Sequence, residues 1–177
     1  MKKLILTVAA VMVSVAAFAQ GQVTFNNRVT GVVDARVTFA DGPNAGAGVG
    51  AGYTAQLFGG ASESALAALN PSTTFRTSSA AALGYVNGVV VDVPSIAAGN
   101  KATLVMKVLD STGAVIGSSK AISVSLGGGT LPPANLEGLA AFTVSVGGGA
   151  PPVIPEPSTL ALAAVGGAAA LLLRRRK

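Results

Sequence analysis

The stretch that decides the fold is Ala102-Thr103-Leu104-Val105-Met106-Lys107-Val108-Leu109, followed by the loop Asp110-Ser111-Thr112-Gly113 and by Ala114-Val115-Ile116-Gly117. Both flanking runs are rich in β-branched and other apolar residues, which favour strands. A short loop that ends in glycine suits the left-handed position of a β-hairpin with a bulge. The stretch therefore predicts an antiparallel hairpin over residues 102–117.

Similar runs occur on both sides of this hairpin. They cover residues 23–26, 35–39, 53–58, 73–77, 85–93, 121–126 and 141–146, with Gly, Pro, Asn and Asp between them. Asn87-Gly88 offers a tight turn that would split the run at 85–93. Residues 62–69 are expected to form one short helix, which Asn70-Pro71 ends. This pattern predicts an all-β domain over residues 20–149, an antiparallel β-sandwich with immunoglobulin-like architecture.

Charge is distributed unevenly along the 177 residues. Of the 12 basic residues, two lie at the N-terminus and four at the C-terminus, and the six in the body are balanced by six acids. A neutral body argues against a nucleic-acid partner, because proteins that bind nucleic acids carry a basic face. The chain has no His and no Cys, which excludes a thiolate nucleophile, a disulfide and a Ser-His-Asp triad. We therefore expect no enzymatic activity, no cofactor and no metal.

The N-terminus has the three parts of a secretory signal peptide. Lys2 and Lys3 precede an apolar run over residues 4–15, and Ala17-Phe18-Ala19 follows it. Small side chains at Ala17 and Ala19 are typical of a signal-peptidase site. Residues 1–19 are therefore predicted to be removed, which makes Gln20 the first residue of the mature chain.

The C-terminus carries a second set of targeting features. Residues 150–157 form a Pro-rich linker that contains Pro155, Glu156 and Pro157, and residues 158–173 are uncharged and apolar. As a helix, this run would reach about 21–24 Å, which is short for a membrane span. A basic tail follows, composed of Arg174, Arg175, Arg176 and Lys177. The pattern predicts a short transmembrane helix with a cytoplasmic tail.

This three-part layout resembles the PEP-CTERM sorting domain over about residues 153–177. The resemblance implies that Pro155, Glu156 and Pro157 form the recognition motif for an exosortase, and that Arg174, Arg175 and Arg176 hold the tail in the cytoplasm. It also implies an inner-membrane intermediate that is processed and sorted to the cell surface or the extracellular space. Signal peptidase and exosortase would then be partners that treat this chain as a substrate.

The body offers few candidate binding sites. Residues 46–52 are Gly-rich but lack the G-x-x-x-x-G-K-[ST] pattern of a phosphate-binding loop, so we expect a surface loop. Residues 127–129 and 147–149 read as glycine linkers. The acids Asp34, Asp41, Asp92 and Asp110 have the chemistry to ligate calcium, although no D-x-D-x-D spacing occurs.

Three functional hypotheses follow. The favoured one is a structural or adhesive protein of the cell surface or matrix, associated with exopolysaccharide or biofilm. The alternative is a carbohydrate- or calcium-binding extracellular module, and the third is an enzyme of unfamiliar type, for which no residue gives positive support.

Overall fold

The computed structural model describes residues 20–146, and within them the secondary structure is almost entirely β. The strands of this range are β1 (Gln20–Phe25), β2 (Arg28–Val29), β3 (Val33–Asp34), β4 (Val37–Phe39), β5 (Thr54–Gly60), β6 (Ala67–Ala68), β7 (Thr73–Thr74), β8 (Val89–Ala97), β9 (Lys101–Leu109), β10 (Val115–Ser118), β11 (Ile122–Ser125), β12 (Ala134–Asn135) and β13 (Phe142–Val144). The predicted all-β class is confirmed. The immunoglobulin-like arrangement stays a prediction.

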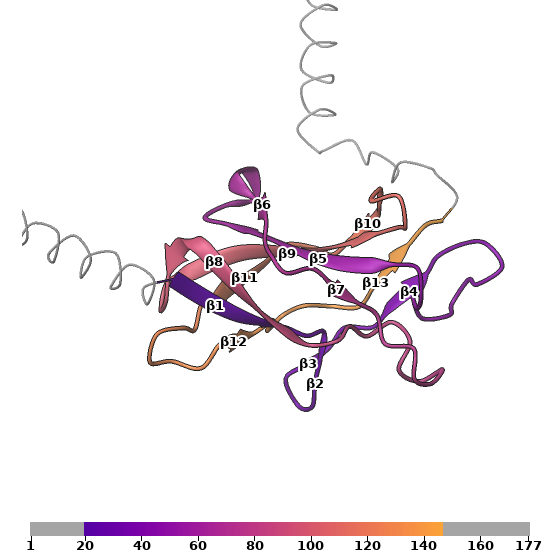
Figure 1. The fold of residues 1–177 in the computed structure, drawn as a ribbon, viewed down its shortest axis with the longest axis horizontal. Helices are drawn as coiled ribbons and strands as arrows, with labels where there is room; N and C mark the ends of the chain where they lie inside the picture. The colour runs from indigo at the N-terminus through magenta and orange to yellow at the C-terminus, as the bar shows by residue number, and fades with distance from the viewer. Residues whose placement is uncertain (1–19, 147–177) are drawn as a thin grey trace, which may run out of the picture.

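The larger sheet is centred on the pair β5 and β9, which run antiparallel over seven residue pairs from Thr54↔Leu109 to Gly60↔Thr103. β10 and β11 pair one after the other with the free edge of β9, while β6 and β7 pair with β5 (Figure 1). The hairpin predicted over residues 102–117 is confirmed as β9 and β10. Its loop closes with Gly113 in the left-handed region at φ 83°, and a register shift after Val115 is the expected bulge.

The second sheet has the order β12-β1-β8. β1 is antiparallel to β8 but parallel to β12, and β13 is likewise parallel to β4. The prediction of a purely antiparallel fold is therefore wrong at these two pairings. A short turn forces neighbouring strands to run antiparallel, whereas β12 and β13 pair with strands from the opposite end of the chain, whose direction no tight turn dictates.

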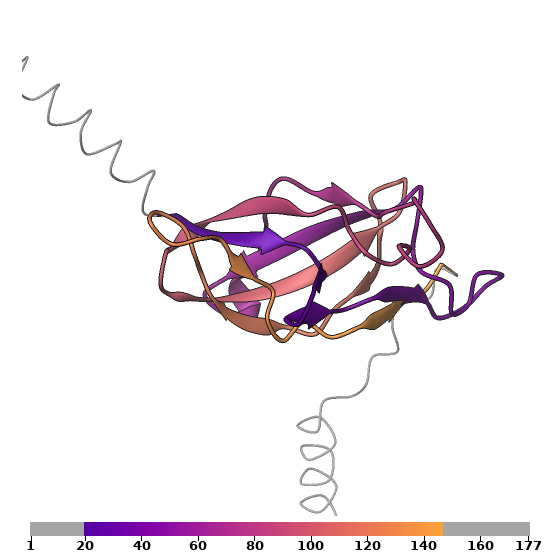
Figure 2. The same ribbon diagram turned by 90° about the horizontal axis from the view of Figure 1, so that it is seen from below.

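One hydrophobic core joins the two sheets, whose strands run broadly along the long axis of the domain (Figure 2). Alternate residues of each strand face this core, so β1 buries Val23 and Phe25 while β9 buries Leu104 and Met106. The core side chains are mostly Val and Leu, and no disulfide is available because the chain has no cysteine. Packing of this core is therefore the main source of stability.

The helix predicted over residues 62–69 is wrong. A single 3-10 turn, η1 (Glu63–Ala65), is present, and β6 begins two residues after its end. Ser62 makes no side-chain capping bond to the turn. Leu69 is instead buried in the core, and its backbone N–H donates to Leu57 O at 2.8 Å. Pairing with the edge of β5 and burial of Leu69 thus outweigh the helix propensity of this short segment.

The run predicted at residues 85–93 is split at Asn87-Gly88, because Val86 bridges to Phe75 and β8 begins at Val89. Across residues 20–146, no helix is both long and apolar enough to cross a membrane. The predicted signal peptide (1–19), the end of the domain (147–149), the Pro-rich linker (150–157), the transmembrane helix (158–173) and the basic tail (174–177) lie outside the described residues.

Candidate functional site

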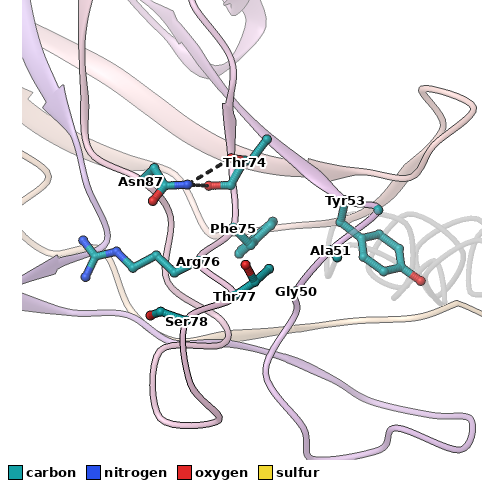
Figure 3. Close-up of a pocket in the computed structure, with 10 residues that line it drawn as sticks. Gly50, Ala51, Tyr53, Thr74, Phe75, Arg76, Thr77, Ser78 and Asn87 are labelled. Atoms are coloured by element: carbon teal, nitrogen blue, oxygen red, sulfur yellow. Dashed lines mark hydrogen bonds between the residues drawn. The ribbon is translucent and has the colours of Figure 1, made fainter.

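A hollow of about 510 Å³ lies where the segment before β5 faces the segment after β7 (Figure 3). Its lining is Gly50, Ala51, Gly52, Tyr53, Thr74, Phe75, Arg76, Thr77, Ser78 and Asn87. The lining therefore combines hydroxyl, amide and guanidinium groups with two aromatic rings, and contains no carboxylate.

Hydrogen bonds between Thr74 and Asn87 fix one wall of the hollow. The Asn87 side-chain amide donates to Thr74 Oγ1 at 3.0 Å and to Thr74 O at 3.3 Å, and the Asn87 backbone N–H donates to Thr74 O at 2.9 Å. Tyr53 on the opposite wall packs edge-on against Phe39, with 5.4 Å between ring centroids. Figure 3 shows Tyr53 and Arg76 pointing to opposite sides. Thr77 and Ser78 contribute two further hydroxyl groups to the lining, beside that of Tyr53.

This chemistry suits hydrogen bonding to a ligand rich in hydroxyl groups. It does not assemble a nucleophile, because a serine or threonine hydroxyl needs a neighbouring base and the lining offers no carboxylate, while the chain has no histidine. Arg76 is committed to the protein itself, since its Nε donates to Val86 O at 2.9 Å and its Nη2 donates to Asn26 Oδ1 at 3.4 Å.

Asn27, which the sequence analysis did not single out, organises the interior beside this hollow. Its side chain is fully buried, donates to Ala35 O at 2.7 Å and to Gly84 O at 2.9 Å, and accepts from the Val86 backbone N–H at 2.9 Å. Val23, Phe25 and Asn27 are buried at alternate positions. Extending the alternation of β1 by two residues would therefore have pointed to a buried Asn27.

The three arginines of the β domain, Arg28, Arg36 and Arg76, all contact residues 83–86, the segment to which Asn27 is also hydrogen-bonded. Arg36 Nε donates to Leu83 O at 2.9 Å, and the guanidinium of Arg28 lies 4.7 Å from the centre of the Tyr85 ring. The Tyr85 hydroxyl donates to Asp34 Oδ1 at 2.6 Å. This bond to a carboxylate, and secondarily burial, raises the pKa of Tyr85 above its ordinary value. These arginines therefore hold residues 83–86 in place through side-chain contacts.

The four acids considered for calcium are not brought together. Each accepts a hydrogen bond in a different part of the fold: Asp34 from Tyr85, Asp41 from Val146 N–H, Asp92 from Gln22 and Asp110 from Thr112. At Asp110, bonds from the Thr112 hydroxyl and from the backbone N–H groups of Thr112 and Ala114 lower the carboxyl pKa. Among residues 20–146, no group of three or more acids is placed to hold a metal ion.

The glycine segments at residues 46–52 and 127–129 are more ordered than the expected loop and linker. Gly48 and Val49 are buried, and Val49 N–H donates to Val37 O. Gly127 exchanges two backbone hydrogen bonds with Gln22, and a Cβ placed on it would lie 1.8 Å from Pro132 O. Glycine is needed at Gly127 because the backbone of residues 132–134 approaches it closely.

The sequence-predicted sorting residues lie outside residues 20–146. They are Ala17 and Ala19 of the signal-peptidase site, Pro155, Glu156 and Pro157 of the motif, and Arg174, Arg175, Arg176 and Lys177 of the tail.

Comparison with protein families matches residues 153–177 to the PEP-CTERM protein-sorting motif. The resemblance deduced for the C-terminal segment is confirmed, with the same boundaries. No curated protein and no solved structure matched the chain. The motif implies an exported protein that passes through the membrane, is a substrate of an exosortase and is sorted to the cell envelope. It covers only the C-terminal segment, so it does not bear on the role of the β domain.

Proposed function

We propose that this chain is a non-enzymatic surface or matrix protein with a structural or adhesive role, and that its β domain associates with extracellular polysaccharide. The observation that carries the proposal is the sorting motif at residues 153–177. A protein that is delivered to the envelope by a dedicated signal acts where exopolysaccharide and biofilm material accumulate.

The two ends supply the delivery steps. Lys2 and Lys3 stay on the cytoplasmic side while the apolar run enters the membrane, and signal peptidase cuts after Ala19. The short helix over residues 158–173 then holds the chain in the membrane, with the basic tail in the cytoplasm. The exosortase recognises Pro155-Glu156-Pro157, because proline keeps this segment extended and accessible.

The body supports a passive role. Its six basic and six acidic residues cancel, and it lacks the histidine and cysteine on which most nucleophilic catalysis depends. We also propose that its two main sheets form an immunoglobulin-like sandwich, an architecture that many surface proteins use without sharing sequence. A hydrolase screen on the purified protein that detects turnover would contradict the non-enzymatic role.

The sorting step is tested in a host that has an exosortase and in the same host without it. The full chain should change from a larger, membrane-associated form to a smaller form at the surface or in the medium only when the exosortase is present. A variant with Pro155→Ala, Glu156→Ala and Pro157→Ala should stay in the larger form in both hosts. Pro151→Ala with Pro152→Ala changes the same linker outside the motif and serves as the matched control, which should be processed normally. Equal size and location in both hosts would refute the proposal.

A carbohydrate-binding module is the second candidate, and the hollow beside Tyr53 favours it over a calcium-binding one. Hydroxyl and amide groups line the hollow, whereas the acids are dispersed and already hydrogen-bonded. A ligand of the native state raises the melting temperature. Titration with oligosaccharides from the host's own exopolysaccharide, and separately with calcium, distinguishes the two. Thr77→Ala with Ser78→Ala should abolish a carbohydrate-dependent rise.

A further inference from the structure

Gln20 occupies an unusual place, because the first residue of β1 is also the residue that follows the signal-peptidase site. Gln20 is paired with Ala97 of β8, and the strand is more tightly held from Gly21 onward. A Cβ on Gly21 would lie 2.2 Å from Leu126 Cδ1, and Gln22 exchanges backbone hydrogen bonds of 2.8 and 3.0 Å with Gly127. The register with β8 shifts between Gln20 and Gly21, and Gln20 itself is only half-buried.

We propose that Gln20 is a modification site, at which the mature N-terminus closes to a pyroglutamyl lactam. The inference rests on the signal-peptide cleavage in the proposed function. Once the bond after Ala19 is cut, the α-amine of Gln20 attacks Cδ of its own side chain. A bond forms between the α-nitrogen and Cδ, the Cδ–Nε2 bond breaks, and Nε2 leaves as ammonia with the proton that the amine gives up. No oxidant, reductant or cofactor is required.

The surroundings of Gln20 are compatible with this reaction. An α-amine has a pKa of about 8, so a substantial fraction is unprotonated and nucleophilic near neutral pH. Ring closure uses only atoms of Gln20, and the bonds of Gly21 and Gln22 keep β1 in place while it occurs. The hydrogen bonds of β1 beyond Gln20 are therefore unaffected by the modification.

Within residues 20–146, the surface next to the Gln20 carbonyl presents no charged side chain. The backbone O of Gln20 lies against Gly128, where a Cβ would be 2.6 Å away. Gly128 also lines an open hollow of about 610 Å³ with Ala98, Gly129, Thr130 and Leu131, a side chain that is 52% exposed. No charged side chain lines this hollow. The lactam removes the positive charge of the terminus.

Mass spectrometry of the exported protein tests the inference. Free amines are blocked by reductive dimethylation before digestion, so that glutamine cannot cyclise during sample handling. The expected N-terminal peptide begins at residue 20, lacks the dimethyl label and is lighter by one ammonia. Edman degradation should be blocked until a pyroglutamyl aminopeptidase is added. Gln20→Ser should give a labelled, sequenceable terminus, while Gln22→Ser, the matched control, should keep the lighter, unlabelled one.

The outcomes separate this inference from the proposed function. A peptide that begins with a dimethylated, intact Gln20 overturns the lactam while leaving signal-peptide cleavage in place. A peptide that begins at any other residue overturns both the lactam and the predicted cleavage site. Processing at the C-terminal motif is read from the opposite end of the chain and does not depend on either result.

Discussion

Replacing Asn27 with alanine should destabilise the protein far more than an average asparagine substitution. Asn27 is fully buried, and its side chain satisfies backbone groups from two distant segments. Truncation removes the donor to Ala35 O and the acceptor for Val86 N–H. Gly84 O also loses a bond but keeps the one from Val37 N–H at 3.0 Å. Two buried polar groups are thus left without the partner that Asn27 provides.

Each such group costs about 1–3 kcal/mol, so we expect Asn27→Ala, which leaves two of them, to lower the free energy of unfolding by about 2–6 kcal/mol. Asn27→Asp keeps the shape and the acceptor but replaces the donors by a carboxylate oxygen that faces two carbonyls. It should also destabilise at neutral pH. Part of the loss should be recovered in acid, where the protonated carboxyl regains one donor.

Urea unfolding of the purified protein, followed by circular dichroism because the chain has no tryptophan, measures these changes. Asn44 lies on an exposed loop, and Asn44→Ala is the matched control, with an expected change within about 0.5 kcal/mol. A loss for Asn27→Ala no larger than that of the control would refute the reasoning.

Two further predictions concern steric fit and pH. Gly127→Ala places a methyl group 1.8 Å from Pro132 O, so it should cost about 1–3 kcal/mol of stability or prevent folding. Gly88→Ala is the control, because the atom nearest to its new methyl group is 3.3 Å away on a side chain. An equal loss of stability for the two variants in a melting experiment would contradict the steric account. Because the bond to Asp34 raises the pKa of folded Tyr85, stability from this group is complete below the unfolded pKa of 10.0 and should fall as pH rises beyond it. Tyr85→Phe should lose this alkaline dependence, and parallel stability curves for the two proteins would count against it.

The sequence was sufficient to predict strands whose pairing partners lie nearby in the chain. The β9–β10 hairpin follows from two strand-forming runs and a loop that ends in Gly113, and all three lie within the sixteen consecutive residues 102–117. Period-2 alternation likewise predicted the second half of β1 and all of β11. The sorting signal was recognisable for a related reason, since its motif, apolar run and basic tail are contiguous.

The remaining features depend on contacts between distant segments. The parallel pairing of β12 with β1 leaves no mark in either short strand. Gly127 looks like part of a linker, and only the approach of Pro132 explains why it is glycine. The segment at 62–69 has helix-forming composition, but burial of Leu69 against β5 decides its conformation. The hollow combines the segment before β5 with the segment after β7, so no continuous sequence motif predicts it.

The position of β13 has a mechanical consequence. This strand lies between β4 and β10 (Figure 1), with Ala40 N–H donating to Val144 O at 2.8 Å and Ser145 N–H donating to Ile116 O at 3.1 Å. A tension that enters through Val146 pulls along β13 and loads its bonds to both neighbours together as shear. We therefore expect the domain to resist a force applied at Val146 better than it would if β13 lay at a free edge, where its bonds could be broken one after another.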